Sequence, residues 1–267
     1  MEMFSYEFMR NALYAILIIT PLFGLIGTMV VHNKMAFFSD ALGHSAYTGI
    51  AIGMLLGVSN NIISMIVFSV LFAILLNRIN ESRIASKDTI ISVFSSTAIA
   101  LGLVILTRNG NYTAISNYLI GDILSILSEE IIFLLVIAII TIVFWIFFFN
   151  KLLGISVNPT LAKSKGIKVK LFENLFVVLI ALIVTVSIKW VGILIINSLL
   201  ILPAASSRNV SKNMRQYHLF SVLFSIFSGI SGLILSYLLG TSTGPTIVLV
   251  SSIIYFITYG LRRFSID

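Results

Sequence analysis

The sequence is dominated by apolar runs of about 20 residues, which is the length that a helix needs to cross the hydrocarbon core of a bilayer. A spanning segment must also satisfy its own backbone hydrogen bonds, which favours helices. Only 10% of the residues are charged, against roughly 25% in an ordinary soluble domain, and the mean hydropathy is +1.09. The chain is therefore predicted to be an all-α, polytopic membrane protein.

The apolar runs predict nine transmembrane helices, with eight as the alternative. The run at 171–205 is too long for one span and is interrupted by Lys189, so it is interpreted as two helices joined by a tight outer turn, or as one bent or re-entrant element. Because no linker divides the chain, residues 1–267 are predicted to form a single transmembrane domain. The runs lie at residues 13–31, 36–57, 62–77, 89–107, 131–149, 171–205, 219–239 and 245–259.

The distribution of basic residues predicts the orientation of the chain. Lysine and arginine concentrate in short loops on the cytoplasmic side of membrane proteins. If the N-terminus is outside, 14 of the 17 basic residues fall inside, and the outer ones are Arg10, Arg108 and Lys189. The predicted topology is therefore N-terminus outside and C-terminus inside. The inner residues are Lys34, Arg78, Arg83, Lys87, Lys151, Lys163, Lys165, Lys168, Lys170, Arg208, Lys212, Arg215, Arg262 and Arg263.

Several motifs are absent from the sequence, and their absence narrows the function. No phosphate-binding loop, nucleophile elbow or H-E-x-x-H pair is present. The chain is therefore predicted not to be an enzyme, and another subunit must hydrolyse ATP if the protein is a pump. With no cysteine, metal ligands must be histidines, carboxylates or hydroxyls. Membrane orientation explains the net charge of +7, so no nucleic-acid partner is predicted.

Asp40 and His44 are the most informative polar residues, since both lie inside the second apolar run. A charged residue at the centre of a membrane helix costs roughly 2.5 to 3.5 kcal/mol on insertion scales, so it normally marks a functional or paired site. A spacing of four residues places both side chains on one helix face, where a carboxylate oxygen and an imidazole nitrogen can converge on a cation. This pair is half of a metal site. The alternative is that Asp40 caps the helix and His44 packs between helices.

The same run carries Gly49, Gly53 and Gly57 at intervals of four residues. Small residues at this spacing let another helix approach closely. On a helical wheel the glycines lie away from Asp40, so one side of the helix is predicted to pack while the other side can line a pathway.

Residues 158–166 are predicted to form a short helix at the cytoplasmic face. Asn158 is a good N-cap, Pro159 suits the first helical position and Gly166 is a typical stop. Such a helix can dock a partner protein, or its lysines can contact anionic lipid. The residues alone leave both interpretations open.

Five segments, in order along nearly the whole chain, resemble signatures of the permease subunits of bacterial zinc, manganese and iron ABC importers. The resemblance implies that Asp40 and His44 are metal ligands in the translocation pathway. It also implies that residues 158–166 form a coupling helix, in which Pro159, Leu161, Ala162 and Gly166 dock on an ATPase. The segments are MAFFSDALGHSAYTGIAIGMLLG, NYLIGDILSI, NPTLAKSKGIKV, KWVGILIINSLLILPAASSR and STGPTIVLV.

Two positions depart from the pattern of this family. Ser39 stands where the family often has glycine, and Gly43 stands where it often has serine or alanine. Neither change removes a ligand atom. Asn197 and Ser198, in the fourth segment, are predicted neighbours of the pathway, although hydrogen bonding between helices explains them equally well.

The resemblance implies a larger assembly in a bacterial cell membrane. Its expected parts are a second permease copy, most simply a homodimer, two cytoplasmic ATPases and an extracellular metal-binding protein. Two copies of Asp40 and His44 would supply four ligands to the transported ion, with no permanently bound cofactor. The second run is most similar to the zinc branch, so zinc is the expected ion, but manganese and iron suit the same ligands.

Other classes of function remain open at this stage. An ion-coupled secondary transporter could use Asp40 and His44 as a proton relay, but it should transport alone and usually shows two related halves, which the sequence lacks. A membrane enzyme would need a catalytic constellation beyond this pair. Permeases for siderophores or cobalamin are usually longer and would not need the pair.

Overall fold

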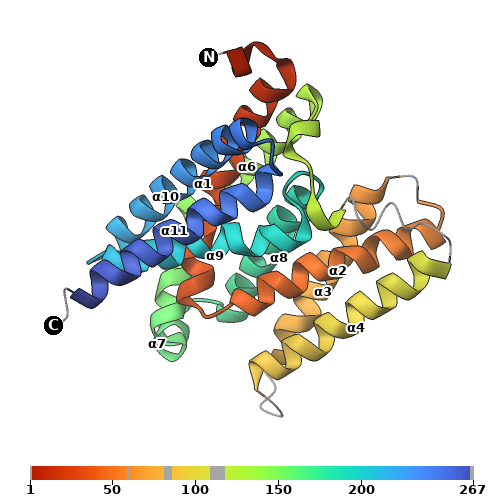
Figure 1. Ribbon diagram of the computed structural model, residues 1–267. Coiled ribbons are helices and arrows are strands. Elements are labelled where there is room, and N and C mark those ends of the chain that lie inside the picture. Colours follow the sequence, from red (N-terminus) through yellow and green to blue (C-terminus); the bar gives the residue numbers. More distant parts are fainter. Residues whose placement is uncertain (1, 59, 81–85, 109–117, 265–267) are drawn as a thin grey trace. The chain divides into compact units, whose positions relative to one another are not determined.

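The computed structural model describes residues 2–58, 60–80, 86–108 and 118–264, which are mostly helical and contain no strand. Two predicted residues lie outside these ranges. They are Arg83, which belongs to the basic inner set, and Asn117, which begins the second family segment. The all-helical fold class is confirmed. The long helices, labelled in Figure 1, are α1 (Glu7–His32), α2 (Ala36–Leu55), α3 (Asn61–Asn80), α4 (Lys87–Arg108), α6 (Ser128–Val157), α8 (Val169–Val191), α9 (Ile193–Val210), α10 (Met214–Leu239) and α11 (Thr243–Phe264). The short ones are η1 (Glu2–Ser5), η2 (Ile123–Ser125) and α7 (Pro159–Ser164).

Seven of the helices in the described ranges are long and apolar enough to cross a membrane. They are α1, α3, α4, α6, α8, α10 and α11. The chain is therefore a multi-pass membrane protein, as the sequence predicts. The other two long helices carry the predicted site residues: α2 contains Asp40 and His44, and α9 contains Asn197 and Ser198.

The chain folds as two compact units. Unit 1 consists of Met1–Lys34, Tyr118–Ile140 and Lys189–Asp267, and unit 2 consists of Met35–Asn117 and Thr141–Ile188. The prediction of a single transmembrane domain over residues 1–267 stays a prediction.

In unit 1, α1 packs against α9 and α10, and α11 packs against the same two helices (Figure 1). Small and hydroxyl side chains make the approach of α1 and α10 close. Ser221 and Ser225 of α10 donate hydrogen bonds of 2.6 Å to the α1 carbonyls of Gly24 and Thr20. Such contacts replace hydrophobic association, which cannot bring helices together inside lipid.

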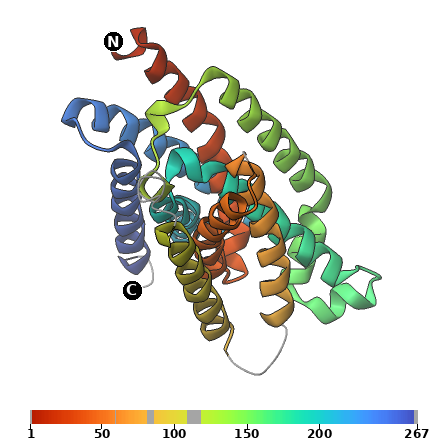
Figure 2. The same ribbon diagram turned by 90° about the vertical axis from the view of Figure 1, so that its right-hand side faces the viewer.

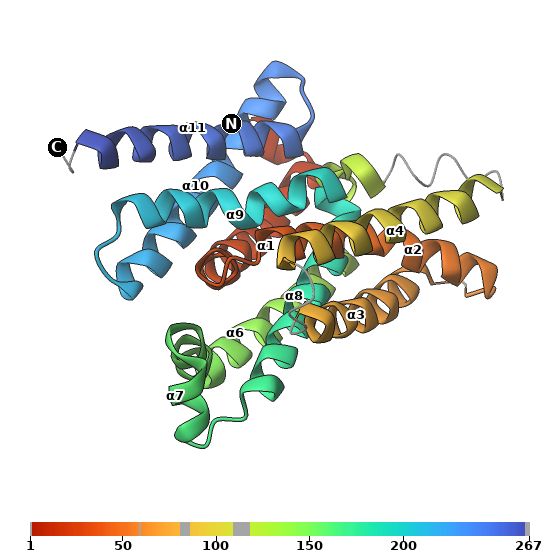
Figure 3. The same ribbon diagram turned by 90° about the horizontal axis from the view of Figure 1, so that it is seen from below.

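In unit 2, α2 packs against α3 and α4 (Figure 3). On α4, a Cβ atom at Gly102 would lie 2.9 Å from the backbone nitrogen of Thr48, so this position is filled by α2. The Thr48 hydroxyl donates to the carbonyl of Ala98. Two faces of α2 are thus covered by its neighbours.

The long apolar run at 171–205 is divided at Gly192. The sequence placed the turn near Lys189, but Lys189 lies in the last turn of α8, and α9 begins directly after Gly192. The backbone at Gly192 has a φ of 86°, which favours glycine, and a Cβ there would collide with the backbone of Ile120. A helix break at the positive φ of Gly192, rather than the charge on Lys189, separates the two helices.

Figure 2 shows α7 as a short turn of helix between the end of α6 and the start of α8. The side chain of Asn158 accepts a hydrogen bond of 3.0 Å from the backbone of Leu161, and Pro159 occupies the first position of the helix. At the other end, Gly166 adopts a φ of 79° and the Ile167 amide donates to the Ala162 carbonyl over 3.1 Å. These bonds form a Schellman cap, so the boundaries of α7 are set by local chemistry.

Candidate functional site

Asp40 and His44 lie one turn apart on α2, with both side chains on the same side of the helix. His44 Nε2 is 3.6 Å from Asp40 Oδ2. This separation is longer than a good hydrogen bond, so the two groups face each other without forming a hydrogen bond. The side chain of Asp40 is 41% exposed and that of His44 is 21% exposed. Both are accessible in a helix that is otherwise mostly buried.

The hydroxyl groups beside the pair are bonded to the backbone of α2 itself. Ser39 donates to the Ala36 carbonyl and Ser45 donates to the Leu42 carbonyl, each over 2.8 Å. Both serines are buried. They occupy the packed sides of α2, which leaves the side that carries Asp40 as the open one.

The pair offers one carboxylate oxygen and one imidazole nitrogen to a cation, a donor set that suits zinc, manganese and ferrous iron. Tetrahedral zinc sites normally use four ligands. Across the described part of the chain, no group of three or more His, Asp or Glu side chains is placed to hold a metal. In one copy of the described chain, Asp40 and His44 are therefore two possible ligands, fewer than the four of a tetrahedral zinc site.

The three predicted packing glycines differ in their surroundings. A Cβ at Gly49 would lie 2.9 Å from Met65 Cα, and one at Gly53 would collide with Ser64, so both positions face α3 at close range. Gly57 lies beyond the end of α2, is exposed and has nothing within 4 Å of its Cβ position. The close approach of α2 and α3 thus involves two glycines, and Gly57 belongs to the turn that follows.

Asn197 and Ser198 lie near the start of α9 and are half-buried. They belong to unit 1, whereas Asp40 and His44 belong to unit 2. Their role as neighbours of the pathway therefore stays a prediction.

The α7 segment and the turn after it expose the apolar Leu161 and the lysines Lys163 and Lys165. Leu161 is 52% exposed, while Ala162 is buried. A surface groove of about 760 Å³ runs beside the helix and is lined by residues that include Pro159, Lys163 and Gly166. An exposed leucine close in sequence to exposed lysines is a feature that suits a partner protein, and this docking role is a prediction.

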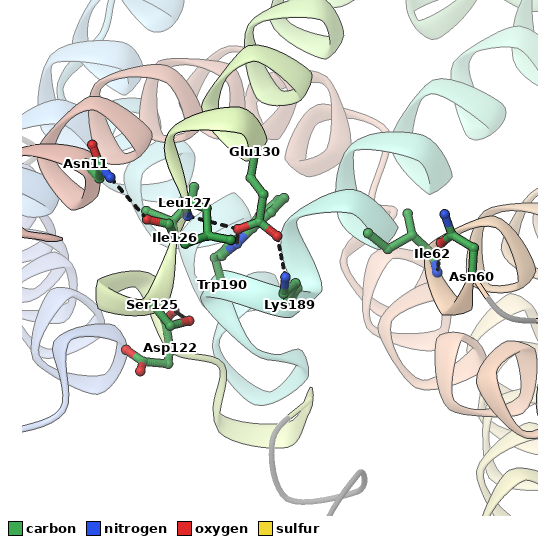
Figure 4. Close-up of polar contacts among 10 residues, drawn as sticks. All are labelled: Asn11, Asn60, Ile62, Asp122, Ser125, Ile126, Leu127, Glu130, Lys189 and Trp190. Atoms are coloured by element: carbon green, nitrogen blue, oxygen red, sulfur yellow. Dashed lines mark hydrogen bonds and ion pairs between the residues drawn. The ribbon is translucent and has the colours of Figure 1, made fainter.

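Glu130 forms a polar centre in unit 1 that the sequence did not reveal. Figure 4 shows its carboxylate between Lys189 and Trp190. One oxygen accepts from Lys189 Nζ, and the other accepts from Trp190 Nε1 over 3.1 Å and from the Leu127 amide over 3.0 Å. The start of α6 is therefore fixed to the end of α8. The sequence does contain a signal for this contact, because Lys189 is a charged residue inside an apolar run. It was interpreted only as an interruption of that run.

The segment before α6 is also held by α1. The side-chain amide of Asn11 lies 3.4 Å from the carbonyl oxygen of Ile126 and 3.3 Å from the hydroxyl of Ser128 (Figure 4 shows the contact with Ile126). Together with the bonds of Glu130, this contact connects the start of α1, the start of α6 and the end of α8, at the end of unit 1 that the sequence predicts to be outside.

Comparison with known proteins identifies the family to which the sequence belongs. Residues 5–261 match the ABC 3 transport family. The chain belongs to the ABC 3 transport family. Proteins of this family are transporter permeases, and in such systems the ATPase is a separate subunit. The family assignment thus confirms the resemblance found in the sequence and agrees with the absence of a phosphate-binding loop.

Relatives and solved structures match this chain over nearly its whole length. The high-affinity zinc uptake system membrane protein ZnuB of Haemophilus influenzae is 34% identical over 97% of this chain and 99% of the relative. The manganese import system permease protein ScaB of Streptococcus gordonii is 28% identical over 96% of this chain and 91% of the relative. PsaBC from Streptococcus pneumoniae, solved in complex with a Fab, has a TM-score of 0.86 at 26% identity, covering 97% of this chain and 93% of the matched chain.

Proposed function

We propose that this chain is the membrane permease of an ABC importer for divalent metal ions, and that Asp40 and His44 bind the ion as it crosses. The observation that carries the proposal is the accessible carboxylate and imidazole on one face of α2, 3.6 Å apart, in a chain of the ABC 3 transport family.

Zinc is the proposed ion. ZnuB, named for zinc uptake, is 34% identical to this chain, compared with 28% for ScaB, named for manganese import. The ligands themselves accept either ion, since imidazole and carboxylate bind both. The choice between the two ions therefore rests on the similarity of the whole chain.

The proposed assembly contains a second copy of the chain, cytoplasmic ATPases that dock on α7 and an extracellular metal-binding protein. A homodimer is supported by the two ligands that one copy provides, because a second Asp40 and His44 would bring the set to four. Docking on α7 is supported by the exposed Leu161 and the groove beside it. ATP hydrolysis on the inner side would then drive release of the ion inward.

Nine spans with the N-terminus outside and the C-terminus inside are proposed for the topology. The support is nine helices of 18 residues or more within the described ranges, together with the concentration of lysine and arginine on one side. Since the chain has no cysteine, single cysteines placed in the loops would report which loops a membrane-impermeant thiol reagent reaches.

Metal uptake tests the proposed function directly. Cells that lack their own zinc and manganese importers would express this chain with or without its ATPase and binding protein, and would receive zinc or manganese separately. We expect zinc uptake that requires the ATPase. Uptake without the ATPase would instead support an ion-coupled secondary transporter, and a preference for manganese would correct the ion while leaving the importer assignment intact.

A further inference from the structure

Asn77 and Asn174 connect α3 to the second turn of α8 within unit 2. Asn77 Nδ2 donates a hydrogen bond of 2.9 Å to Asn174 Oδ1, and the pair is partly buried. Within the described residues, backbone contact between α3 and α8 is sparse compared with that between α2 and α3. The two amides therefore form a directional link between helices whose backbones lie apart over most of their length.

One end of this link leads to α7. The Schellman cap after α7 passes into α8 within a few residues, so the two helices are joined by an ordered turn. Behind the turn, the rings of Phe148 and Phe172 lie 5.5 Å apart, and the ammonium group of Lys151 lies 4.9 Å from the centre of the Phe172 ring. The end of α6 and the start of α8, which carries Asn174, are thus in direct contact on either side of α7.

The other end of the link leads to α2. The hydroxyl oxygens of Ser45 on α2 and Ser69 on α3 are 3.5 Å apart, which sets the antiparallel register of the two helices. The same register places Ala41 opposite Ala73, and neither has any exposed surface. Asn77 follows Ala73 by one helical turn.

This register sets the level of Asn77 along the helix axis relative to the candidate metal ligands. Asp40 directly precedes Ala41 on α2, so Asn77 lies about one turn, or ~5 Å along the helix axis, from the level of Asp40. Gly49 and Gly53 remove the side chains that would separate α2 from α3. These glycines bring α2 and α3 close together near the start of α3, and the serine contact continues the packing of the two helices toward Asp40.

We infer that the hydrogen bond between Asn77 and Asn174 couples movement of α7 to the ion-binding pair on α2. The inference rests on the proposed function, because it requires an ATPase that acts on α7. Asn77 and Asn174 are positioning residues that do not touch the ion. An amide pair suits this task, since each amide carries both donors and an acceptor and can exchange partners during a movement without exposing a buried charge.

The experiment measures zinc entry and ATP hydrolysis in the same proteoliposomes, which contain the complete complex of permease and ATPase and are supplied with the binding protein. The variants are Asn77→Leu, Asn174→Leu and the double variant. We expect ATP hydrolysis to continue while zinc transported per ATP falls about fivefold or more, the lower end of typical coupling between sites. The ratio of zinc transported to ATP hydrolysed should fall no further in the double variant than in either single variant, because all three variants lose the same hydrogen bond.

Asn209 provides a matched control in unit 1. Its side-chain amide donates to the Thr258 hydroxyl over 3.3 Å, between α9 and α11, so it is also an interhelical amide in a membrane helix. Asn209→Leu should change thermal stability to a similar degree but leave zinc per ATP unchanged. If a leucine variant of Asn77 does not reach the membrane, Asn77→Ser shortens the side chain beyond the reach of Asn174, and the same fall in the ratio is expected.

Three results would overturn the inference. Variants with a wild-type ratio of zinc to ATP would show that the bond does not couple the two sites. An equal fall in Asn209→Leu would show that the effect belongs to helix packing in general, and multiplicative losses in the double variant would show that the two asparagines act separately. A wild-type complex that moves neither zinc nor manganese would overturn the proposed function as well.

Discussion

Helices α2 and α6 differ in the polar groups that their exposed surfaces carry. Only 17% of the spanning window of α6 is buried, and its exposed side chains are bulky and apolar, among them Ile139, Ile146 and Phe147. Helix α2 is mostly buried and exposes apolar side chains at its two ends, Phe37 and Leu55, but between them it also exposes an aspartate and a histidine. An exposed isoleucine in a membrane helix matches the lipid, whereas an exposed carboxylate does not, so it must face water, an ion or another protein chain. The chemistry of an exposed face therefore distinguishes lipid contact from function.

The largest effect is expected from the two ligand candidates. Asp40→Asn removes the negative charge and His44→Ala removes the imidazole, so zinc uptake in importer-depleted cells should fall at least tenfold, about the lower bound seen when even the outer partners of a metal site are lost. Ile139→Ala on α6 is the control and should transport normally at an equal membrane level. Normal uptake in both α2 variants would break the comparison, because the exposed pair would then be structural.

The glycines of the two helices should differ in their tolerance of a side chain. Gly49→Leu forces a Cβ to within 2.9 Å of Met65 Cα, so we expect a loss of about 1 to 3 kcal/mol in the free energy of unfolding. Gly154→Leu in α6 has nothing within 4 Å of its Cβ position and should not destabilise the protein. Thermal unfolding in detergent measures both. Equal losses would mean that α2 and α3 are not in close contact.

A smaller effect is expected at the polar start of α6, which is the exception to its apolar character. Glu130→Gln weakens the contacts with Lys189 and Trp190 and should lower the free energy of unfolding by about 1 kcal/mol, since Lys189 is 40% exposed and solvent screens the pair. The exposed neighbour Glu129 serves as the control through Glu129→Gln, which should be neutral. In a double-mutant cycle with Lys189→Met, additive losses would exclude an interaction between the two charges.

The smallest effect is expected on the lipid-facing side of α6. Val143→Leu exchanges one exposed apolar side chain for another, so unfolding should change by no more than about 0.5 kcal/mol. Ala41→Leu on α2, at a position with no exposed surface, should cost about 1 to 3 kcal/mol. A similar cost at both positions would show that Val143 packs against protein.

Features set by local sequence could be predicted, and contacts between distant segments could not. The length of the apolar runs gave the helices, and capping chemistry gave the start and end of α7. Lys189 was taken as the point of the break because a charge interrupts a hydropathy pattern, whereas the helix ends at Gly192 because of its backbone conformation. Gly57 fitted the four-residue spacing, but the helix ends before it.

The candidate site shows the same division. The spacing of Asp40 and His44 predicted a shared face, since it depends on one helix alone. The hydrogen bond between Asn77 and Asn174 joins residues 97 positions apart, and no sequence pattern near either residue predicts its partner. The partners of Glu130 were hidden for the same reason, because they lie about 60 residues further along the chain.

The coordination of zinc in the purified complex tests the central claim most directly. X-ray absorption at the zinc edge would be recorded for the complex of permease and ATPase loaded with zinc, using wild type, Asp40→Asn and His44→Ala. The account predicts a shell of oxygen and nitrogen ligands with imidazole scattering that disappears in His44→Ala, and zinc binding that weakens in Asp40→Asn. An unchanged spectrum with unchanged zinc content in both variants would contradict it, because the ion would then be held by other residues.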